Sequence, residues 1–210
     1  MEFVIIGSGS GALQAHRGPS GYVLNLKDET FLLDGGTGTV KKCLEADISY
    51  KEIDKIFYTH LHPDHTIDLV PFLFATKHTP DFIRTKPLEI YGPVGFRDFY
   101  EKFTSLYGTG ITDVDYDITV RELDDIRKTF DNWSLETGLM RHAHNAIGYR
   151  FESEGKALVY SGDTDYCEGI VRLAQNADVL ILECSFPDDM KVGGHLTPSE
   201  AGRIATEANV

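Results

Sequence analysis

The sequence has little of three features that would each point to a distinct class of protein. It has no run that approaches the roughly 20 apolar residues of a membrane-spanning helix, so no membrane segment is expected. Its first residues lack the basic stretch of a secretory signal peptide, which favours a cytoplasmic location. It has only three cysteines, far apart and in no CxxC pair, so we expect neither a disulfide framework nor a cysteine metal site.

Positive charge is scarce as well. The 210 residues carry 20 Lys and Arg against 33 Asp and Glu, which gives a net charge of −13, and the basic residues form no run. A general nucleic-acid binder needs a basic surface that neutralises phosphates, so the charge balance disfavours long nucleic acids as partners. It also disfavours docking on an anionic membrane. A small anionic or ester substrate, held by a local pocket or by bound cations, remains compatible with it.

The length and composition are those of an ordinary folded protein, with 41% hydrophobic and 25% charged residues. We therefore expect a single domain over residues 1–210, incomplete at its C-terminal end because one further strand would follow the last helix. Strands are expected at 3–6, 22–26, 30–33, 53–58, 88–91, 116–123, 134–141, 147–152, 157–160 and 179–183, and helices at 39–46, 66–76, 96–107, 168–176 and 199–208. Because both halves alternate strands with helices, the predicted fold is an α/β protein of αββα sandwich type, with two mixed β-sheets flanked by helices.

The strongest chemical signal is the segment Thr59-His60-Leu61-His62-Pro63-Asp64-His65, directly after an apolar run. Neutral imidazoles and carboxylates are ligands that divalent zinc prefers. The carboxyl end of a strand is where α/β sheets gather ligands and catalytic groups. His60 and His62 lie on the same side of an extended segment, and Pro63 then turns the chain towards a second position. The segment therefore predicts a site for two adjacent cations.

The arrangement His-x-His-x-Asp-His after a strand that ends in Thr resembles the signature of the metallo-β-lactamase fold. Further segments resemble other motifs of that family: Asp34-Gly35-Gly36, Ser161-Gly162-Asp163-Thr164, residues 178–183 and Gly194-His195-Leu196-Thr197. The segment 87–93, followed by a helix, resembles the branch that holds ribonuclease Z and its phosphodiesterase relatives. The resemblance implies a hydrolase with the metallo-β-lactamase fold.

The resemblance also implies a set of metal ligands and two divalent ions, with Zn²⁺ first and Mn²⁺ or iron as alternatives. One ion would be bound by two histidines of the first motif and a third from the middle of the chain, the second ion by an aspartate and two histidines, and one aspartate would bridge them. Both His142 and His144 qualify as the third histidine, and the spacing to the following Gly148 favours His142. The expected ligands are His60, His62, Asp64, His65, His142, Asp163 and His195.

Such a site predicts hydrolysis by a hydroxide that bridges the two ions, most favourably of a phosphodiester or a related ester. Two ions about 3.5–4 Å apart lower the pKa of a shared water and stabilise both the attacking and the leaving oxygen. Besides binding metal, Asp64 is expected to orient the nucleophile or pass a proton. His144, if it is not a ligand, is the candidate acid for the leaving group.

The glycine-rich segment 7–12 loosely matches a dinucleotide-binding fingerprint, which requires a helix to begin there. Gly18 and Pro19 follow too early for a helix, so no cofactor-binding residues are expected. The segment resembles instead the first loop of the ribonuclease Z branch, where Arg17 and Ser20 would approach a phosphate.

Three alternatives stay open. The first is ribonuclease Z proper, a tRNA 3′-processing endonuclease. The chain differs from the pattern of that enzyme in two ways. It has Pro63 where the enzyme has Gly, and it has only a short interval between His142 and Asp163, where the enzyme carries a long basic arm. The second is a di-iron redox protein, which would need a flavin domain. The third is a non-catalytic binding subunit, which would lack ligands. A homodimer is compatible with the sequence.

Overall fold

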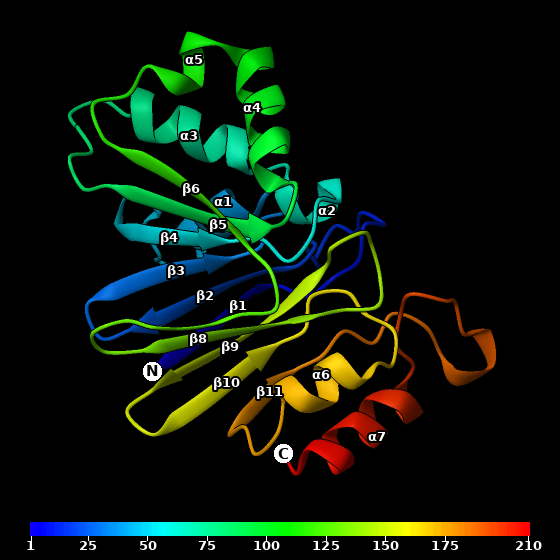
Figure 1. The fold of residues 1–210 in the computed structure, drawn as a ribbon. Helices are drawn as coiled ribbons and strands as arrows, with labels where there is room; N and C mark the ends of the chain where they lie inside the picture. Colours follow the sequence, from blue (N-terminus) through cyan, green and yellow to red (C-terminus); the bar gives the residue numbers. More distant parts are fainter. The chain divides into compact units, whose positions relative to one another are not determined.

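The computed structural model describes residues 1–210, and the chain divides into two compact units. One unit holds residues 2–122, and the other holds residues 123–210 together with Met1. Each unit is built on one β-sheet (Figure 1). The single domain expected over the whole chain stays a prediction.

The first unit contains a six-stranded sheet in the order β1-β2-β3-β4-β5-β6. Neighbours from β1 to β3 pair antiparallel, whereas β3, β4 and β5 run parallel, so the sheet is mixed. Its strands are β1 (Glu2–Gly7), β2 (Gly21–Leu26), β3 (Glu29–Leu33), β4 (Ile53–Phe57), β5 (Leu88–Pro93) and β6 (Ile118–Leu123). The apolar runs of the sequence supply its core, because β3 and β4 bury almost every hydrophobic side chain.

Helices of the first unit pack on this sheet through their apolar residues. They are α1 (Thr39–Glu45), α2 (Pro63–Thr66), α3 (Leu69–His78), α4 (Phe96–Tyr107) and α5 (Thr109–Thr112), with a 3₁₀ turn at Tyr50–Glu52. Figure 1 shows α3, α4 and α5 lying together at one edge of the unit. The aromatic residues of α4 are largely core: Phe96 is fully buried, and Phe99 and Phe103 pack partly buried against the same cluster.

The helix expected at residues 66–76 is in fact interrupted. α2 begins at Pro63, and α3 begins only at Leu69. Between them, the buried carboxylate of Asp68 accepts hydrogen bonds from the N–H groups of Gly38 (2.9 Å) and Val40 (2.8 Å) at the start of α1. Burial raises the pKa of Asp68, and these backbone hydrogen bonds act in the opposite direction. The interruption thus ties α1 to the segment that follows the histidine-rich motif.

The second unit contains a five-stranded mixed sheet in the order β11-β10-β9-β8-β7, in which only β10 and β11 pair parallel. Its strands are β7 (Arg127–Thr129), β8 (Ser134–Leu139), β9 (Ile147–Ser153), β10 (Lys156–Tyr160) and β11 (Val179–Ile181). The sequence did not predict β7, since all three of its residues are polar and exposed at the sheet edge. The apolar side chains of β9 and β10 are buried, whereas β8 buries Leu135 and leaves Leu139 exposed, and all three strands match the predicted ranges closely.

Two helices, α6 (Glu168–Leu173) and α7 (Pro198–Ala208), lie side by side on this sheet (Figure 1), and a 3₁₀ turn spans Asp188–Met190. Ile170 and Leu173 of α6 and Ile204 of α7 are fully buried in their shared core. A capping box formed by Thr197 and Glu200 begins α7. The prediction of two mixed sheets flanked by helices is therefore confirmed, and none of the helices combines the length and the apolar character that crossing a membrane requires.

Candidate metal centre

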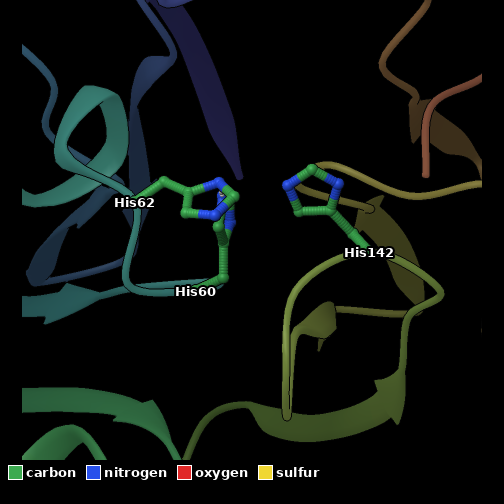
Figure 2. Close-up of side chains that lie close together, drawn as sticks. All are labelled: His60, His62 and His142. Atoms are coloured by element: carbon green, nitrogen blue, oxygen red, sulfur yellow. Dashed lines mark hydrogen bonds between the residues drawn. The ribbon is translucent and has the colours of Figure 1, made fainter. Parts of the chain in front are cut away.

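The histidine loop, residues 59–65, follows β4, includes the first three residues of α2 and carries four of the predicted ligands. Figure 2 shows the rings of His60 and His62 close together on this loop. The Nε2 atom of His60 lies 3.1 Å from the Nδ1 atom of His62. Two nitrogens that each lie about 2.0–2.1 Å from a tetrahedral zinc are about 3.3–3.4 Å apart, so this pair fits a single ion.

One buried carboxylate orients two rings of the histidine loop. The Oδ2 atom of Asp34 accepts hydrogen bonds from His65 Nδ1 (2.8 Å) and from Thr59 Oγ1 (2.9 Å). Because the Thr59 hydroxyl donates its proton to Asp34, it accepts from His60 Nδ1 at 3.0 Å. Both rings are thus held through Nδ1, which leaves Nε2 as the atom for a metal. Asp34 itself is fully buried at a φ of 53°, a conformation that these hydrogen bonds stabilise.

Asp64 is half-buried in α2, and its carboxylate Oδ2 lies 3.8 Å from His65 Nε2. The glycine-rich segment 7–11 approaches it closely, since a Cβ atom at Gly11 would lie 2.9 Å from that oxygen. No helix begins in this segment, so the dinucleotide fingerprint is not met. The segment is instead a neighbour of a candidate ligand.

The second unit brings together three predicted ligands from three separate segments. His142 follows β8 (Figure 2), Asp163 follows β10, and His195 precedes α7. One possible ligand atom from each lies within 4.8 Å of the others. His142 Nε2 is 3.7 Å from Asp163 Oδ2, and His195 Nδ1 is 3.9 Å from the same oxygen. The 3.7 Å between His142 Nε2 and Asp163 Oδ2 is compatible with a cation shared by these two residues.

Both histidines of the second unit are also held through Nδ1. His142 Nδ1 donates to the carbonyl oxygen of Gly194 at 2.8 Å, and His195 Nδ1 donates to Glu183 Oε1 at 2.8 Å. Gly194 has a φ of +89°, and a Cβ atom there would lie 3.3 Å from His142 Nδ1, so glycine suits this position. Nε2 of each ring remains the atom that can bind a metal or carry a proton.

His144 lies apart from this group. Its side chain is exposed and has no hydrogen-bond or ion-pair partner, and it is His142 rather than His144 that lies near Asp163 and His195. An exposed, unpartnered imidazole is available to a substrate. Its role as an acid and the identity of the third histidine ligand stay predictions.

The residues that orient the candidate ligands have no predicted role in the sequence. Asp34 and Glu183 each follow an apolar strand, which is a weak signal for a polar group at the end of that strand. Asp165 and Lys191, which bond to the segment before His195, carry no signal in the sequence at all. Their contacts exist only because distant segments meet in the fold.

Three cations stand out in this acidic chain because their side chains have no ion-pair, hydrogen-bond or aromatic partner: Arg17, Lys42 and Arg141. Lys42 lies beside Gly18, where a Cβ atom would be 2.9 Å from its Cε, and Arg17 lies beside Gly9, where a Cβ atom would be 3.1 Å from its Cγ. The third directly precedes His142. Positive charge that no acidic side chain neutralises is thus placed next to the glycine-rich loop and beside a candidate ligand.

Comparison with known proteins gives one consistent family. The β-lactamase superfamily domain matches residues 29–210. A ribonuclease Z of Thermococcus onnurineus is 29% identical, and the match covers 100% of this chain and 82% of that protein. The human tRNase Z short form has a TM-score of 0.86 at 27% identity, covering 100% of this chain and 89% of that one. A metallo-β-lactamase fold protein of Bacillus subtilis has a TM-score of 0.83 at 27% identity, covering 99% and 81%.

These relatives overturn one expectation. The charge balance predicts that long nucleic acids are disfavoured as partners, and this prediction is wrong, because relatives that match the whole chain are named ribonuclease Z and tRNase Z. Net charge is a sum over the entire surface, whereas binding of a phosphate depends on the local potential. A charge of −13 coexists here with unpaired Arg and Lys side chains near candidate ligands. The net charge therefore does not exclude RNA as a binding partner.

The family carries the functional conclusion as well, since its fold implies divalent metal ions and its relatives are hydrolases. The predicted ribonuclease Z-like and phosphodiesterase character is confirmed at this level, while the redox and non-catalytic alternatives gain no support. The match over residues 29–210 shows that the chain belongs to the β-lactamase superfamily, in which it is a ribonuclease Z-like, metal-dependent hydrolase of the metallo-β-lactamase fold.

Proposed function

We propose that this protein hydrolyses phosphodiesters at a dinuclear metal centre, and that RNA is among its substrates. The seven ligands would be His60, His62, Asp64, His65, His142, Asp163 and His195. The observation that carries the proposal is that four of the five histidines donate Nδ1–H to a fixed acceptor, namely Thr59, Asp34, Gly194 or Glu183. Metal-binding histidines are held by such hydrogen bonds in known sites, and ordinary surface histidines need none.

The donor set fits divalent ions of intermediate hardness. It contains only imidazole nitrogens and carboxylate oxygens and no thiolate, a combination that suits zinc, with manganese and iron as alternatives. Two bound ions would supply Lewis acidity, which lowers the pKa of water and neutralises charge on the phosphate. All further steps fall to side chains of the chain itself.

In the proposed reaction, water attacks phosphorus, and the bond from phosphorus to the leaving alcohol oxygen breaks. Asp64 orients the attacking water and takes one proton from it, which its half-exposed carboxylate near His65 permits. His144 donates a proton to the leaving oxygen, a role for which its exposed ring is free. The products are an alcohol and a phosphomonoester.

Two observations support RNA as a substrate. Relatives over the full chain length are named ribonuclease Z. In addition, the side chains of Arg17, Lys42 and Arg141 have no acidic partner, so they are available to bind backbone phosphates of a longer substrate. A small diester offers no such second phosphate, so these cations favour the longer substrate.

The test uses purified protein, bis(p-nitrophenyl) phosphate and an RNA with a 3′ extension, each with and without a chelator. Asp163→Ala should reduce turnover of both substrates to below about 0.1% of wild type, because it removes the proposed bridging ligand. Its circular dichroism should stay unchanged. The matched control is Asp131→Ala, since Asp131 is an exposed aspartate of the same unit without a partner.

A metal-loaded Asp163→Ala variant with normal activity would contradict the proposed centre. Cleavage of the small diester without cleavage of RNA would support phosphodiesterase activity and contradict the proposal that RNA is a substrate.

A further inference from the structure

The 191–197 loop links the 3₁₀ turn Asp188–Met190 to α7 and carries His195. It has no regular structure of its own, and it contains Gly193 and Gly194, which lower its intrinsic order. Both candidate histidines of the second unit nevertheless depend on it. His195 is part of it, and His142 donates to the carbonyl oxygen of Gly194.

A lysine–aspartate pair fixes this loop. Lys191 Nζ donates to Asp165 Oδ1 at 2.7 Å and to the carbonyl oxygen of His195 at 2.6 Å, and it also donates to Glu200 of α7. The other oxygen of Asp165 accepts from the N–H of Gly194 at 3.0 Å. The loop is therefore bonded at its start, at Gly194 and at His195 through two side chains.

Asp165 also reaches the segment that carries His142. Its backbone N–H donates to the carbonyl oxygen of Arg141, the residue before His142, at 2.9 Å. Asp165 itself lies two residues after Asp163 on the segment that follows β10. The segments that carry all three predicted ligands of this unit are thus joined at one buried aspartate.

We propose that Asp165 and Lys191 are a positioning pair that sets the orientation of His142 and His195 together. This inference rests on the proposed function in one respect, namely that the two histidine rings bind metal. Because Gly194 contacts both Asp165 and His142, a displacement of the loop moves the hydrogen-bond acceptor of one ring and the backbone of the other. Loss of the pair is expected to weaken metal binding through both histidines at once.

Alternative roles for the pair are less consistent with the contacts. An ion pair that only stabilised the surface would have no reason to include the carbonyl oxygen of a candidate ligand, yet Lys191 donates to that of His195. The Lys156–Asp178 pair of the same unit, at 2.6 Å, is an ordinary surface pair of this kind. It provides the matched control.

The experiment compares Lys191→Met and Asp165→Asn with Lys156→Met in the full chain. We expect zinc affinity, measured by competition with a chromophoric chelator, to fall 10- to 100-fold in the first two variants, the usual range for residues that hold a metal ligand in place. Amide hydrogen exchange of residues 192–196 in the metal-free protein should become faster. The double variant should lose no more than the stronger single variant, because both act on one network. Lys156→Met should change neither quantity.

Unchanged zinc affinity and unchanged amide hydrogen exchange in both variants would contradict the proposed role of the pair. If Lys191→Met does not fold, Lys191→Gln, which keeps one donor, should give an intermediate effect. The proposed function fails separately: wild-type protein without diesterase activity would refute it, while the exchange and zinc data would still decide the role of the pair.

Discussion

The histidine loop of the first unit and the 191–197 loop of the second present candidate ligands in opposite ways. The first packs four candidates into six residues and is held from within by Asp34, a fully buried carboxylate. The second carries one candidate and is held by the exposed Lys191 together with Asp165, which is buried but keeps 9% of its surface exposed. The other two candidate ligands of its unit come from segments far away in the sequence.

The difference separates rigid from adjustable parts of a proposed metal site. A buried carboxylate with three hydrogen bonds cannot lose a partner without leaving polar groups unsatisfied in the interior. A network that water reaches can lose a bond and replace it with a water molecule. Damage to the first loop should therefore cost stability and function together, whereas damage to the second should cost mainly function.

The largest effect is expected for Asp34→Asn. Asparagine tolerates the φ of 53° and keeps the size of the side chain, but its amide cannot accept all three hydrogen bonds from Thr59 and His65. We expect a loss of about 2 kcal/mol in the free energy of unfolding and a 10- to 100-fold loss in zinc affinity. Chemical denaturation and chelator competition measure the two effects.

Asp81→Asn is the matched control for this variant, because Asp81 has a φ of 58° and is exposed. It should change neither quantity. If Asp34→Asn were as stable as Asp81→Asn, the histidine loop would not be held from within, and the contrast between the two loops would disappear.

The same contrast explains how much of the fold the sequence could predict. Buried strands such as β3 and β4 are runs of apolar residues, and such runs can be identified without any knowledge of their neighbours. β7 has no apolar residue, and it is a strand only because β8 lies beside it. The interruption between α2 and α3 depends on the contact of Asp68 with α1, 28 residues away from Val40 in the sequence.

For the candidate site, the sequence indicates candidate ligands but not the groups that orient them. The four candidates of the histidine loop share one motif, so their chemistry is local. Asp34 and His65 are 31 residues apart, and Asp165 and Gly194 are 29 residues apart. Pairings over such intervals follow from the tertiary fold, which spacing along the chain does not encode. The net charge gives a wrong prediction about nucleic-acid partners for the same reason, because it does not say where in the fold the charged side chains lie.

A smaller effect is expected for Glu183→Gln in the second unit. Glu183 accepts from His195 Nδ1 at 2.8 Å and from the N–H of Thr164 at 3.0 Å, and its other oxygen accepts from Ser185. Glutamine keeps one oxygen for these donors but loses the charge that favours Nδ1–H of His195. We expect zinc affinity and turnover to fall about 10-fold, the lower end of the range for such residues.

The free energy of unfolding should change by less than about 1 kcal/mol in this variant, because glutamine keeps an oxygen for the N–H of the buried Thr164, while water can replace the bonds to the partly exposed His195 and the exposed Ser185. Glu168→Gln, an exposed position of α6, is the control. A destabilisation as large as that of Asp34→Asn would show that the second loop is as rigid as the first.

The smallest perturbation is chemical labelling, which compares the reactivity of two thiols, one in each unit. Cys43 is fully buried, and burial, reinforced by the negative charge of Asp68, raises its pKa to about 11. Cys184 is exposed next to Glu183, and partial burial and that carboxylate raise its pKa as well. Only the thiolate reacts with iodoacetamide, so a higher pKa slows labelling at a given pH, and a buried thiolate must also be reached by the reagent.

We expect Cys184 to be alkylated at pH 7.5 at least about 100-fold faster than Cys43, which should react only as fast as the first unit opens. Peptide mass spectrometry during a time course measures both rates in one sample, and denatured protein supplies the control in which the two thiols react alike. Because Cys43 is fully buried, the reagent reaches it only in the opened unit, so its labelling should follow the opening of the unit at each pH. Equal rates in the folded protein at pH 7.5 would mean that the core beneath α1 opens as readily as the surface near Glu183, and the distinction between a rigid and an adjustable half would no longer hold.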